Sequence, residues 1–499
     1  MKEILSVENM RKSDAATIAG GIPGRELMYR AGKGIFESVE WKAPVAIVAG
    51  SGNNAGDGYV IAKFLHDAGI ECEIILLKEK FSDDGRYYYD RCMEAGISSA
   101  LWNETVDLSG YKTIADCIFG TGFCGEVSGI AEEVIKKINE SKACVVSVDI
   151  NSGLNGDSGM AELCVVSDLT VSIGSYQPGH FLNMAKDVMK EKRNIDIGIK
   201  SVDPAYGLIE EGDIRQLFRP RKNYSNKGTY GYTALIGGSE RYSGAVRLAG
   251  YASAAMRSGA GVVKLAAPKN LGSVIMSEIL ESTYFPLSEK EGAVVFEERE
   301  IAELISNVKT VAFGMGIGTS EGAADILKYL LTHYEGKLIV DADGLTLLSR
   351  MDRESINNRR CELILTPHIK EFSRLTGKEI KDILEAPVNA AMSYAEDNRL
   401  ILLLKGPSTI VTDGEKTYIV DAGCAGMATA GSGDVLSGIL SAVCAYSDDM
   451  LMAAAAGAYI NGKAGVAAQD MNGSISMTAG DTIKCIPGII KALELAEKS

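Results

Sequence analysis

Long hydrophobic runs are absent from this chain of 499 residues. No apolar stretch reaches the ~18 residues that a transmembrane helix requires, so we predict no membrane partner. The segment from Met1 to Asp14 also lacks the apolar core of an export signal. We therefore expect a cytoplasmic protein.

Cysteine pairs and histidines are scarce as well. The ten cysteines are scattered without a C-x-x-C motif, and only four histidines occur. This usage argues against a disulfide framework, a zinc site or a histidine metal cage. The sequence predicts reduced thiols.

Basic residues are outnumbered: 51 Lys and Arg against 66 Asp and Glu give a net charge of −15. Such a balance argues against a nucleic-acid partner and favours a small-molecule one. The chain is rich in apolar residues, which make up 46% of it, and in glycine, of which it has 55. Both features are typical of a loop-rich α/β protein. The length favours two or three domains.

The first half repeats a unit of strand, glycine-rich or polar loop, and helix. We expect strands at 45–49, 73–77, 113–117 and 144–148, helices at 59–67, 87–95 and 130–138, and a lead-in helix over 13–29 that Gly20, Gly21 and Pro23 partly break. This order predicts a Rossmann-like, doubly wound parallel sheet. The loops at the carboxyl ends of its strands form one crevice, where ligands bind.

Oxygen-bearing side chains gather at these strand ends: Asn53, Asn54, Asp57, Asp116, Asp149 and Ser152. Taken singly, each acid is better explained as a strand-end cap. Their joint placement favours a ligand site, and oxygen donors without histidine suit a hard cation.

Three stretches resemble the YjeF N-terminal family of NAD(P)H-hydrate epimerases: Asn53–Gly58, Asp116 with Gly120-Thr121-Gly122, and Asp149–Gly153. The resemblance implies that K⁺ is held by Asn54, Asp116 and Ser152, and that Asp149 is the catalytic acid. It implies substrate contacts from Asn53, Asn54, Ala55, Gly56, Asp57, Gly120, Thr121, Gly122 and Gly125.

Two residues depart from the pattern of this family. Asn151 stands where the family usually has proline, and Gln177 stands where it tends to have lysine. With Asn151 in place of proline, the turn before Ser152 loses a fixed φ. A non-catalytic ligand-binding or interaction module stays open as the alternative for this half.

The second half again alternates strands with polar turns and helices. We expect strands at 232–236, 262–266, 311–313, 338–340, 363–365 and 401–404, and helices at 246–258 and 435–446. The join lies near 206–216, which predicts two α/β domains, 1–210 and 211–499.

The turn Gly431-Ser432-Gly433-Asp434 runs directly into the last of these helices. Free N–H groups at a helix N-terminus hold phosphate without lysine. The presence of Asp434 beside a phosphate site is explained if this acid takes a proton from a hydroxyl that attacks a phosphoryl group. The plainer interpretation is a flexible loop with an N-cap aspartate.

Other turns of this half also have two interpretations. Lys405-Gly406-Pro407-Ser408-Thr409 is either a nucleotide contact or turn chemistry, and His368 either contacts substrate or is a hydrogen-bonded structural residue. Asp341 and Asp343 are either solvated or position Mg²⁺ through water.

The ordered set of motifs from Asn226 to Asp434 resembles the YjeF C-terminal domain, a member of the ribokinase-like superfamily that dehydrates NAD(P)H hydrates with ADP or ATP. The resemblance implies substrate contacts from Ala245, Gly316, His368 and Asp434, the last catalytic. It implies that ADP or ATP, with Mg²⁺, contacts Lys405, Gly406, Pro407, Ser408, Thr409, Thr429, Ala430, Gly431, Ser432 and Gly433. A homo-oligomer follows by family analogy, and a small-alcohol kinase is the alternative activity.

Overall fold

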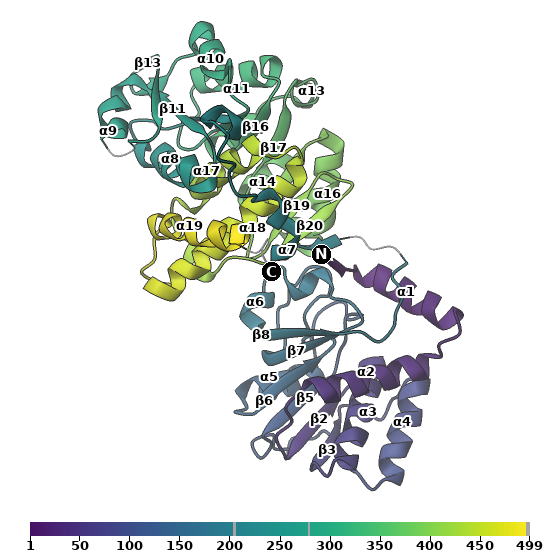
Figure 1. Cartoon of the computed structure of the whole chain (residues 1–499). Coiled ribbons are helices and arrows are strands. Elements are labelled where there is room, and N and C mark those ends of the chain that lie inside the picture. The colour runs from purple at the N-terminus through teal and green to yellow at the C-terminus, as the bar shows by residue number, and fades with distance from the viewer. Residues whose placement is uncertain (203–205, 278–279, 496–499) are drawn as a thin grey trace. The chain divides into compact units, whose positions relative to one another are not determined.

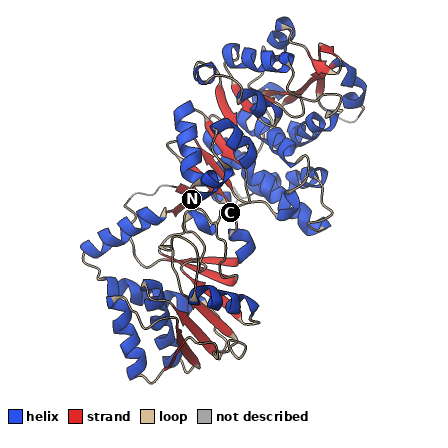
Figure 2. Ribbon diagram, turned by 180° about the vertical axis from the view of Figure 1, so that it is seen from behind, coloured by secondary structure: helices blue, strands red, loops and turns tan. Residues whose placement is uncertain are grey.

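The structure is a computed structural model that describes residues 1–202, 206–277 and 280–495 (Figure 1). The chain divides into two compact units, one of Glu3–Tyr206 and the other of Gly207–Ser499 with Met1–Lys2. In each unit the strands run through the interior with helices around them (Figure 2). Within the described residues, no helix combines the length and the apolar character needed to cross a membrane.

The sheet of the first unit has seven strands in the order β4-β3-β2-β5-β6-β7-β8. Every neighbouring pair is parallel, which confirms the predicted α/β class. The strands are β2 (Val45–Ala49), β3 (Cys72–Leu76), β4 (Ser98–Leu101), β5 (Thr113–Cys117), β6 (Cys144–Val148), β7 (Ser167–Ile173) and β8 (Met189–Ile195). The helices are α1 (Val7–Ala19), α2 (Gly24–Ser38), α3 (Asn53–Asp67), α4 (Asp83–Glu94), α5 (Ile130–Glu140) and α6 (Ala185–Val188).

The two faces of this sheet are covered by different helices. Successive side chains of a strand point to opposite faces. Val45 and Ile47 of β2 pack in one apolar cluster with α2 and α3, whereas Ala46 and Val48 pack in another with α5. The strand is therefore apolar at every position.

The predicted single helix over 13–29 is wrong, because two helices occupy this region. The side chain of Ser6 accepts a hydrogen bond from Asn9 N at 3.1 Å and so caps α1, which begins at Val7, six residues before the predicted start at Ser13. Gly20 ends α1, and Pro23 precedes the first residue of α2. Proline suits that place because its φ is fixed and its missing N–H is not needed there.

The sheet of the second unit follows the order β1-β9-β20-β19-β18-β17-β16-β15-β10-β11-β12. Pairing is parallel from β12 to β18 and antiparallel from β18 to β20. The bounds are β1 (Lys2–Ile4), β9 (Tyr206–Leu208), β10 (Tyr232–Ile236), β11 (Val262–Pro268), β12 (Thr283–Leu287), β15 (Thr310–Phe313), β16 (Lys337–Val340), β17 (Glu362–Leu365), β18 (Ile401–Leu404), β19 (Thr409–Thr412) and β20 (Thr417–Val420). A two-stranded ribbon adds β13 (Glu289–Lys290) and β14 (Ala293–Val294).

Helix α17 (Ser432–Tyr446) lies at the centre of this unit, and its residues from Val435 to Ala445 are all buried. It contributes to one apolar cluster with α18 (Met450–Asn472) and α19 (Ala479–Leu495). The other helices are α7 (Glu211–Ile214), α8 (Ser243–Ser258), α9 (Gly272–Met276), α10 (Glu298–Ile305), α11 (Glu321–His333), α12 (Asp343–Leu348), α13 (Arg353–Asn357), α14 (Ile369–Thr376), α15 (Ile380–Glu385) and α16 (Pro387–Asn398).

Candidate functional site

A cavity of about 590 Å³ opens at the carboxyl ends of β2, β5 and β6 in the first unit. Asp149, the predicted catalytic acid, lines it together with six of the nine predicted substrate contacts: Asn53, Asn54, Asp57, Gly120, Thr121 and Gly122. The other three are not in its lining. Ala55 belongs to the apolar cluster, a Cβ on Gly56 would lie 2.5 Å from Met28 Cε, and Gly125 is an exposed glycine with φ of +100°.

Asp149 is held in place through both its backbone and its carboxylate. Its φ is +68°, a conformation that a non-glycine residue seldom adopts. Its Oδ2 accepts a hydrogen bond from Thr121 N at 2.7 Å, and its carbonyl oxygen lies 2.8 Å from Nε2 of His180. A Cβ on Gly120 would lie 2.7 Å from Oδ2, so this carboxylate sits directly against the Gly-Thr-Gly loop.

Burial raises the pKa of three carboxyl groups in this cavity, those of Asp14, Asp57 and Asp149. Burial first, and then the charges of Asp149 and Asp14, raise the pKa of Asp57 well above its ordinary value. Burial also raises the pKa of Asp149, against the opposing effect of its bonds from Thr121. Burial, followed by the charge of Asp149, raises the pKa of Asp14 to about 6. Perturbed carboxyls in one cavity are the groups from which acid–base catalysts are made.

Of the three residues that the resemblance assigns to K⁺, two are bonded to one another. The carboxylate of Asp116 is fully buried and accepts hydrogen bonds from Ser152 N and from Ser147 Oγ, each at 2.9 Å. Asn54 differs, because both polar atoms of its buried amide lack a hydrogen-bond partner. A buried amide without a partner is costly unless a ligand satisfies it. Asn54 therefore fits a bound cation or substrate.

The two departures from the family pattern are both buried. Asn151 donates to Val165 O at 2.8 Å, Ser167 Oγ at 3.0 Å and Val188 O at 2.9 Å, and it accepts from Thr170 Oγ1 at 2.6 Å. This closed network holds the turn in place of the ring of a proline. Gln177 donates to Ser175 O at 2.8 Å, while its Oε1 is buried without a partner.

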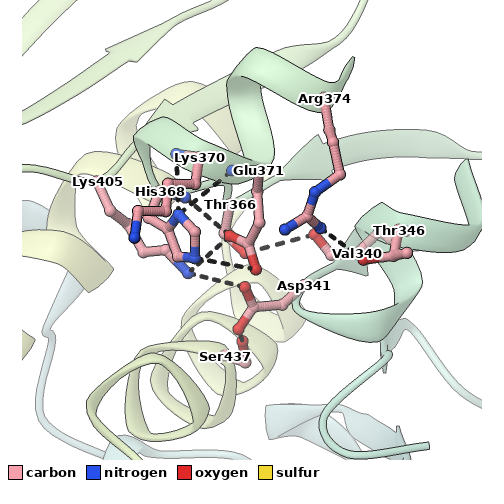
Figure 3. A network of polar contacts seen from close by, with 10 residues as sticks. All are labelled: Val340, Asp341, Thr346, Thr366, His368, Lys370, Glu371, Arg374, Lys405 and Ser437. Atoms are coloured by element: carbon pink, nitrogen blue, oxygen red, sulfur yellow. Dashed lines mark hydrogen bonds and ion pairs between the residues drawn. The ribbon is translucent and has the colours of Figure 1, made fainter. Parts of the chain in front are cut away.

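A second polar cluster lies at the strand ends of the second unit (Figure 3). The carboxylate of Asp341, which follows β16, is 2% exposed. Its Oδ1 lies 2.9 Å from Lys405 Nζ, and its Oδ2 accepts from Ser437 Oγ of α17 at 2.7 Å. Glu371 of α14 completes the cluster with Oε2 at 3.9 Å from the same lysine nitrogen.

This arrangement fixes the charges of its members. Burial opposes the charged form of Asp341, but Lys405 and the hydroxyl of Ser437 outweigh it and hold its pKa below the ordinary value. Burial likewise opposes the charge of Lys405, yet Asp341 and Glu371 raise the pKa of this lysine. The lysine is thus charged and already paired with two carboxylates.

Asp434 lies in the first turn of α17, whose N-cap Gly431 has φ of +92°. A Cβ on Gly433 would lie 3.4 Å from Lys405 Nζ and 3.6 Å from Asp341 Oδ2, so the start of the helix adjoins the lysine–carboxylate pair. Burial, followed by the charge of Asp341, raises the pKa of Asp434 to about 7, and Lys405 opposes this effect. A carboxyl poised near neutrality at a helix N-terminus suits a general base beside phosphate.

The remaining predicted residues of this unit fall into groups. Ala245 and Gly316 are neighbours, because a Cβ on Gly316 would lie 2.9 Å from that of Ala245. His368 caps α14, its Nδ1 accepting from Lys370 N at 3.1 Å and Glu371 N at 3.3 Å. The nucleotide-binding candidates lie in two segments: the β18–β19 turn with Lys405, Gly406, Pro407, Ser408 and Thr409, and the approach to α17 with Thr429, Ala430, Gly431, Ser432 and Gly433.

Within those two segments, the hydroxyls have different surroundings. Ser408 donates to Asp421 Oδ1 at 2.9 Å. Ser432 Oγ is buried without a hydrogen-bond partner at the very start of α17. An unpartnered hydroxyl beside free helix N–H groups fits the phosphate that this turn is predicted to hold.

Sequence reasoning missed three of the groups described above. Ser437 has a signal, since it is a polar residue within the apolar pattern of 435–443. Asp14 shares a helix face with Val7, Met10, Arg11 and Ile18, but the predicted helix began at residue 13 and left out the first three of these. The proximity of Glu371 to Lys405 has no sequence signal.

Comparisons with known proteins find relatives for both units. A family described as NAD(P)H-hydrate dehydratase matches residues 233–488, and one described as YjeF-related protein N-terminus matches residues 24–179. The bifunctional NAD(P)H-hydrate repair enzyme Nnr of Archaeoglobus fulgidus is 33% identical over 500 residues, covering 98% of each chain. The enzyme of the same name from Thermofilum pendens is 32% identical over 466 residues, covering 90% of this chain and 87% of its own.

Solved structures resemble the second unit. The ADP/ATP-dependent NAD(P)H-hydrate dehydratase of Bacillus subtilis, co-crystallised with ATP and Mg²⁺, is 26% identical with a TM-score of 0.51, covering 58% of this chain and 99% of its own. A ribokinase-like superfamily protein of Enterococcus faecalis, 21% identical with a TM-score of 0.50 and covering 58% of this chain and 96% of its own, shows the predicted fold. The chain belongs to the family of bifunctional NAD(P)H-hydrate repair enzymes.

Proposed function

We propose that this chain restores hydrated nicotinamide nucleotides to NAD(P)H with two activities. The first domain, residues 1–210, interconverts the R and S hydrates, and the second, residues 211–499, dehydrates the S form with ADP or ATP. The observation that carries the proposal is the place of Asp434, a carboxyl of pKa about 7 in the first turn of α17.

In the dehydratase, Asp434 takes the proton of the ring hydroxyl, and the hydroxyl oxygen attacks the terminal phosphoryl group of ADP or ATP, so that AMP or ADP leaves. The N–H groups at the start of α17 stabilise the charge that develops on the transferring group. Phosphate then leaves the ring carbon, because it is a far better leaving group than hydroxide, and the ring nitrogen supplies the electron pair. The neighbouring ring carbon loses a proton, which forms the C=C bond of NAD(P)H and completes the loss of water. ADP or ATP enters as its Mg²⁺ complex, which neutralises phosphate charge.

Lys405 has a supporting role in this scheme. Its ammonium group lies 2.9 Å from Asp341 and adjoins Gly433, so it keeps a positive charge beside the turn that receives phosphate. Ala245, Gly316 and His368 are our candidates for contact with the hydrated nucleotide, and Lys405–Thr409 with Thr429–Gly433 for contact with ADP or ATP.

In the epimerase, Asp149 exchanges a proton with the ring hydroxyl of the hydrate. The hydrogen bond from Thr121 N supports its charged form. Asn54, Asp116 and Ser152 would hold K⁺, which supplies a fixed positive charge for oxygen atoms of the substrate. The unpartnered amide of Asn54 supports that assignment.

The test is incubation of the whole chain with mixed hydrate isomers, with and without ADP or ATP. We expect recovery of the absorbance of reduced nicotinamide together with free phosphate. Recovery of the R form should require Asp149, whereas dehydration of the S form should require only Asp434. A stable phosphorylated product without NAD(P)H would contradict the proposal and favour a small-alcohol kinase.

Two further assignments extend this proposal. All ten cysteines are free, which supports a reducing, cytoplasmic location. A homo-oligomer is proposed by family analogy, and light scattering of the purified chain tests it.

A further inference from the structure

Helix α1 presents one face to the cavity of the first unit. Val7, Met10, Arg11, Asp14 and Ile18 all line it, at the three- and four-residue spacing of a helix face. Arg11 Nη2 donates to Gly122 O at 3.2 Å and so ties the helix to the Gly-Thr-Gly loop. Asp14 lies about one turn further along the same face, in a segment that precedes the matched residues 24–179.

Two carboxylates in this cavity, those of Asp14 and Asp57, are not explained by structural bonds within the described residues, and Asp14 is the one that helix α1 contributes. Asp149 accepts a hydrogen bond from Thr121 N, and Asp84 lies 3.3 Å from Arg25 Nε. Asp14 is partly buried, and within the described residues it has neither a hydrogen bond nor an ion pair. A buried carboxyl that supports no neighbour destabilises the fold, so its presence points to the ligand.

We propose that Asp14 is a second catalytic acid–base residue of the epimerase cavity and acts on the substrate together with Asp149. This inference rests on the epimerase function proposed above. Asp149 and Asp14 come from different elements, the end of β6 and the helix α1, and both line the cavity that would hold the hydrated ring. Two acids in one site can move protons to and from two different atoms of the ring.

The step that needs two such groups is opening of the ring at its hydroxyl-bearing carbon. The Asp149 carboxylate takes the hydroxyl proton, a C=O double bond forms at that carbon, and its bond to the ring nitrogen breaks. The electron pair of that bond stays on the nitrogen, which receives a proton from the Asp14 carboxylic acid. The resulting aldehyde rotates, and the nitrogen adds to its other face while both protons return.

The charges in the cavity favour this division of roles. Besides Asp14, its charged or titratable side chains are Arg11, Asp57, Asp84 and Asp149. Burial, followed by the charges of Asp149 and Asp14, raises the pKa of Asp57 well above the ordinary value. Burial, followed by the charge of Asp149, raises the pKa of Asp14 to about 6 and so favours retention of its proton. The hydrogen bond from Thr121 N supports the charged form of Asp149, the partner that acts as the base.

The experiment compares the wild-type chain with the variants D14N, D14E and E8Q. Glu8 lies on α1 and forms an i,i+4 ion pair with Lys12, so E8Q is the matched control on the same helix. The assay follows exchange of the R and S hydrates of NADH by chiral separation, without ADP or ATP, after subtraction of the spontaneous rate. The same preparations are then given ADP, and dehydration of the S form provides the internal control.

We expect D14N to lower kcat for epimerisation by about 100-fold or more, the range of general acid–base catalysis, with KM and dehydration little changed. The wild-type kcat/KM should fall as pH rises above about 6, where Asp14 loses its proton, and D14N should lose this dependence. D14E should recover part of the rate.

Two results would overturn the inference: D14N with a kcat within twofold of wild type, or a loss of rate in D14N with the same pH dependence as wild type. If D14N fails to fold, D14E decides, because a folded D14E that keeps part of the rate and the wild-type pH dependence supports a carboxylic acid at this position, whereas a folded D14E with no epimerase activity opposes it. A wild-type chain no faster than buffer would instead refute the epimerase function itself.

Discussion

Replacement of Asp434 by asparagine should make the protein more stable and abolish dehydration. Burial and the charge of Asp341 disfavour the charged carboxylate, so its pKa moves from 3.8 to about 7. That difference corresponds to about 4 kcal/mol, since one pKa unit is about 1.4 kcal/mol. The helix dipole favours the anion by about 0.3–1 kcal/mol, which is less than the effect of burial and of Asp341. Allowing for relaxation and solvent around this partly buried group, we expect a gain of about 2 kcal/mol.

The size of this effect depends on pH. An acid whose pKa is raised in the folded state binds its proton more tightly there, so the fold loses stability as pH rises from about 4 to about 7. D434N lacks the group and escapes this loss. Above pH 7 the variant should therefore be more stable by the full amount, and near pH 4 the two proteins should be alike.

Calorimetry at pH 5 and pH 8.5 is the appropriate assay. The transition of the second unit is identified as the one that ADP raises, because a ligand stabilises only the part that binds it. At pH 8.5 we expect D434N to melt about 4–8 °C above wild type, with a smaller difference at pH 5. The reasoning would be refuted if D434N melted no higher than wild type at pH 8.5, or if it retained dehydratase turnover.

Three other predictions concern groups that the sites depend on. Lys405→Met removes the cation beside the buried carboxylate of Asp341 and should lower the unfolding free energy by about 3–5 kcal/mol. The measurement is the melting temperature of the second unit, with Lys405→Arg as the control, and an unchanged melting temperature would contradict the ion-pair assignment. Asn151→Ala breaks a buried four-bond network and should cost about 1–3 kcal/mol in the first unit only, so equal losses in both thermal transitions would argue against it. Burial lowers the pKa of His180 to about 4, so the fold should lose about 3 kcal/mol of stability as pH falls from 6.5 to 4. His180→Gln should reduce this dependence of stability on pH in acid titrations followed by circular dichroism. A pH dependence equal to that of wild type would contradict the neutral imidazole.

The central strands of both sheets were predicted well because a strand buried on both faces is a continuous apolar run, whereas β4, β7, β8, β12, β19 and β20 were not predicted. β2, β5, β6, β10 and β18 begin and end at the predicted residues. Helix starts were predicted less well. α3 begins at Asn53 and α17 at Ser432, each several residues before the apolar pattern, because the first turn of these helices faces a site and needs polar or small residues.

The candidate site could be predicted where it lies on one short segment and not where it joins distant ones. Asp434 and the glycines before it are adjacent in the sequence, so their chemistry can be predicted from the sequence alone. Asp341 and Lys405 are 64 residues apart, and nothing in either segment shows that they form an ion pair. Asp14 is 135 positions before Asp149, and α1 reaches the cavity only through the fold.

Asn151 gives the first unit a vulnerability that a proline would not. A pyrrolidine ring restrains its own backbone wherever it is, whereas this amide restrains the turn only while β7, α6 and the segment before β7 stay packed around it and exclude water. Water entering beside Val188 would compete for the same bonds and free the backbone next to Ser152. Mutations on β7 or α6 can therefore loosen the turn that carries Ser152.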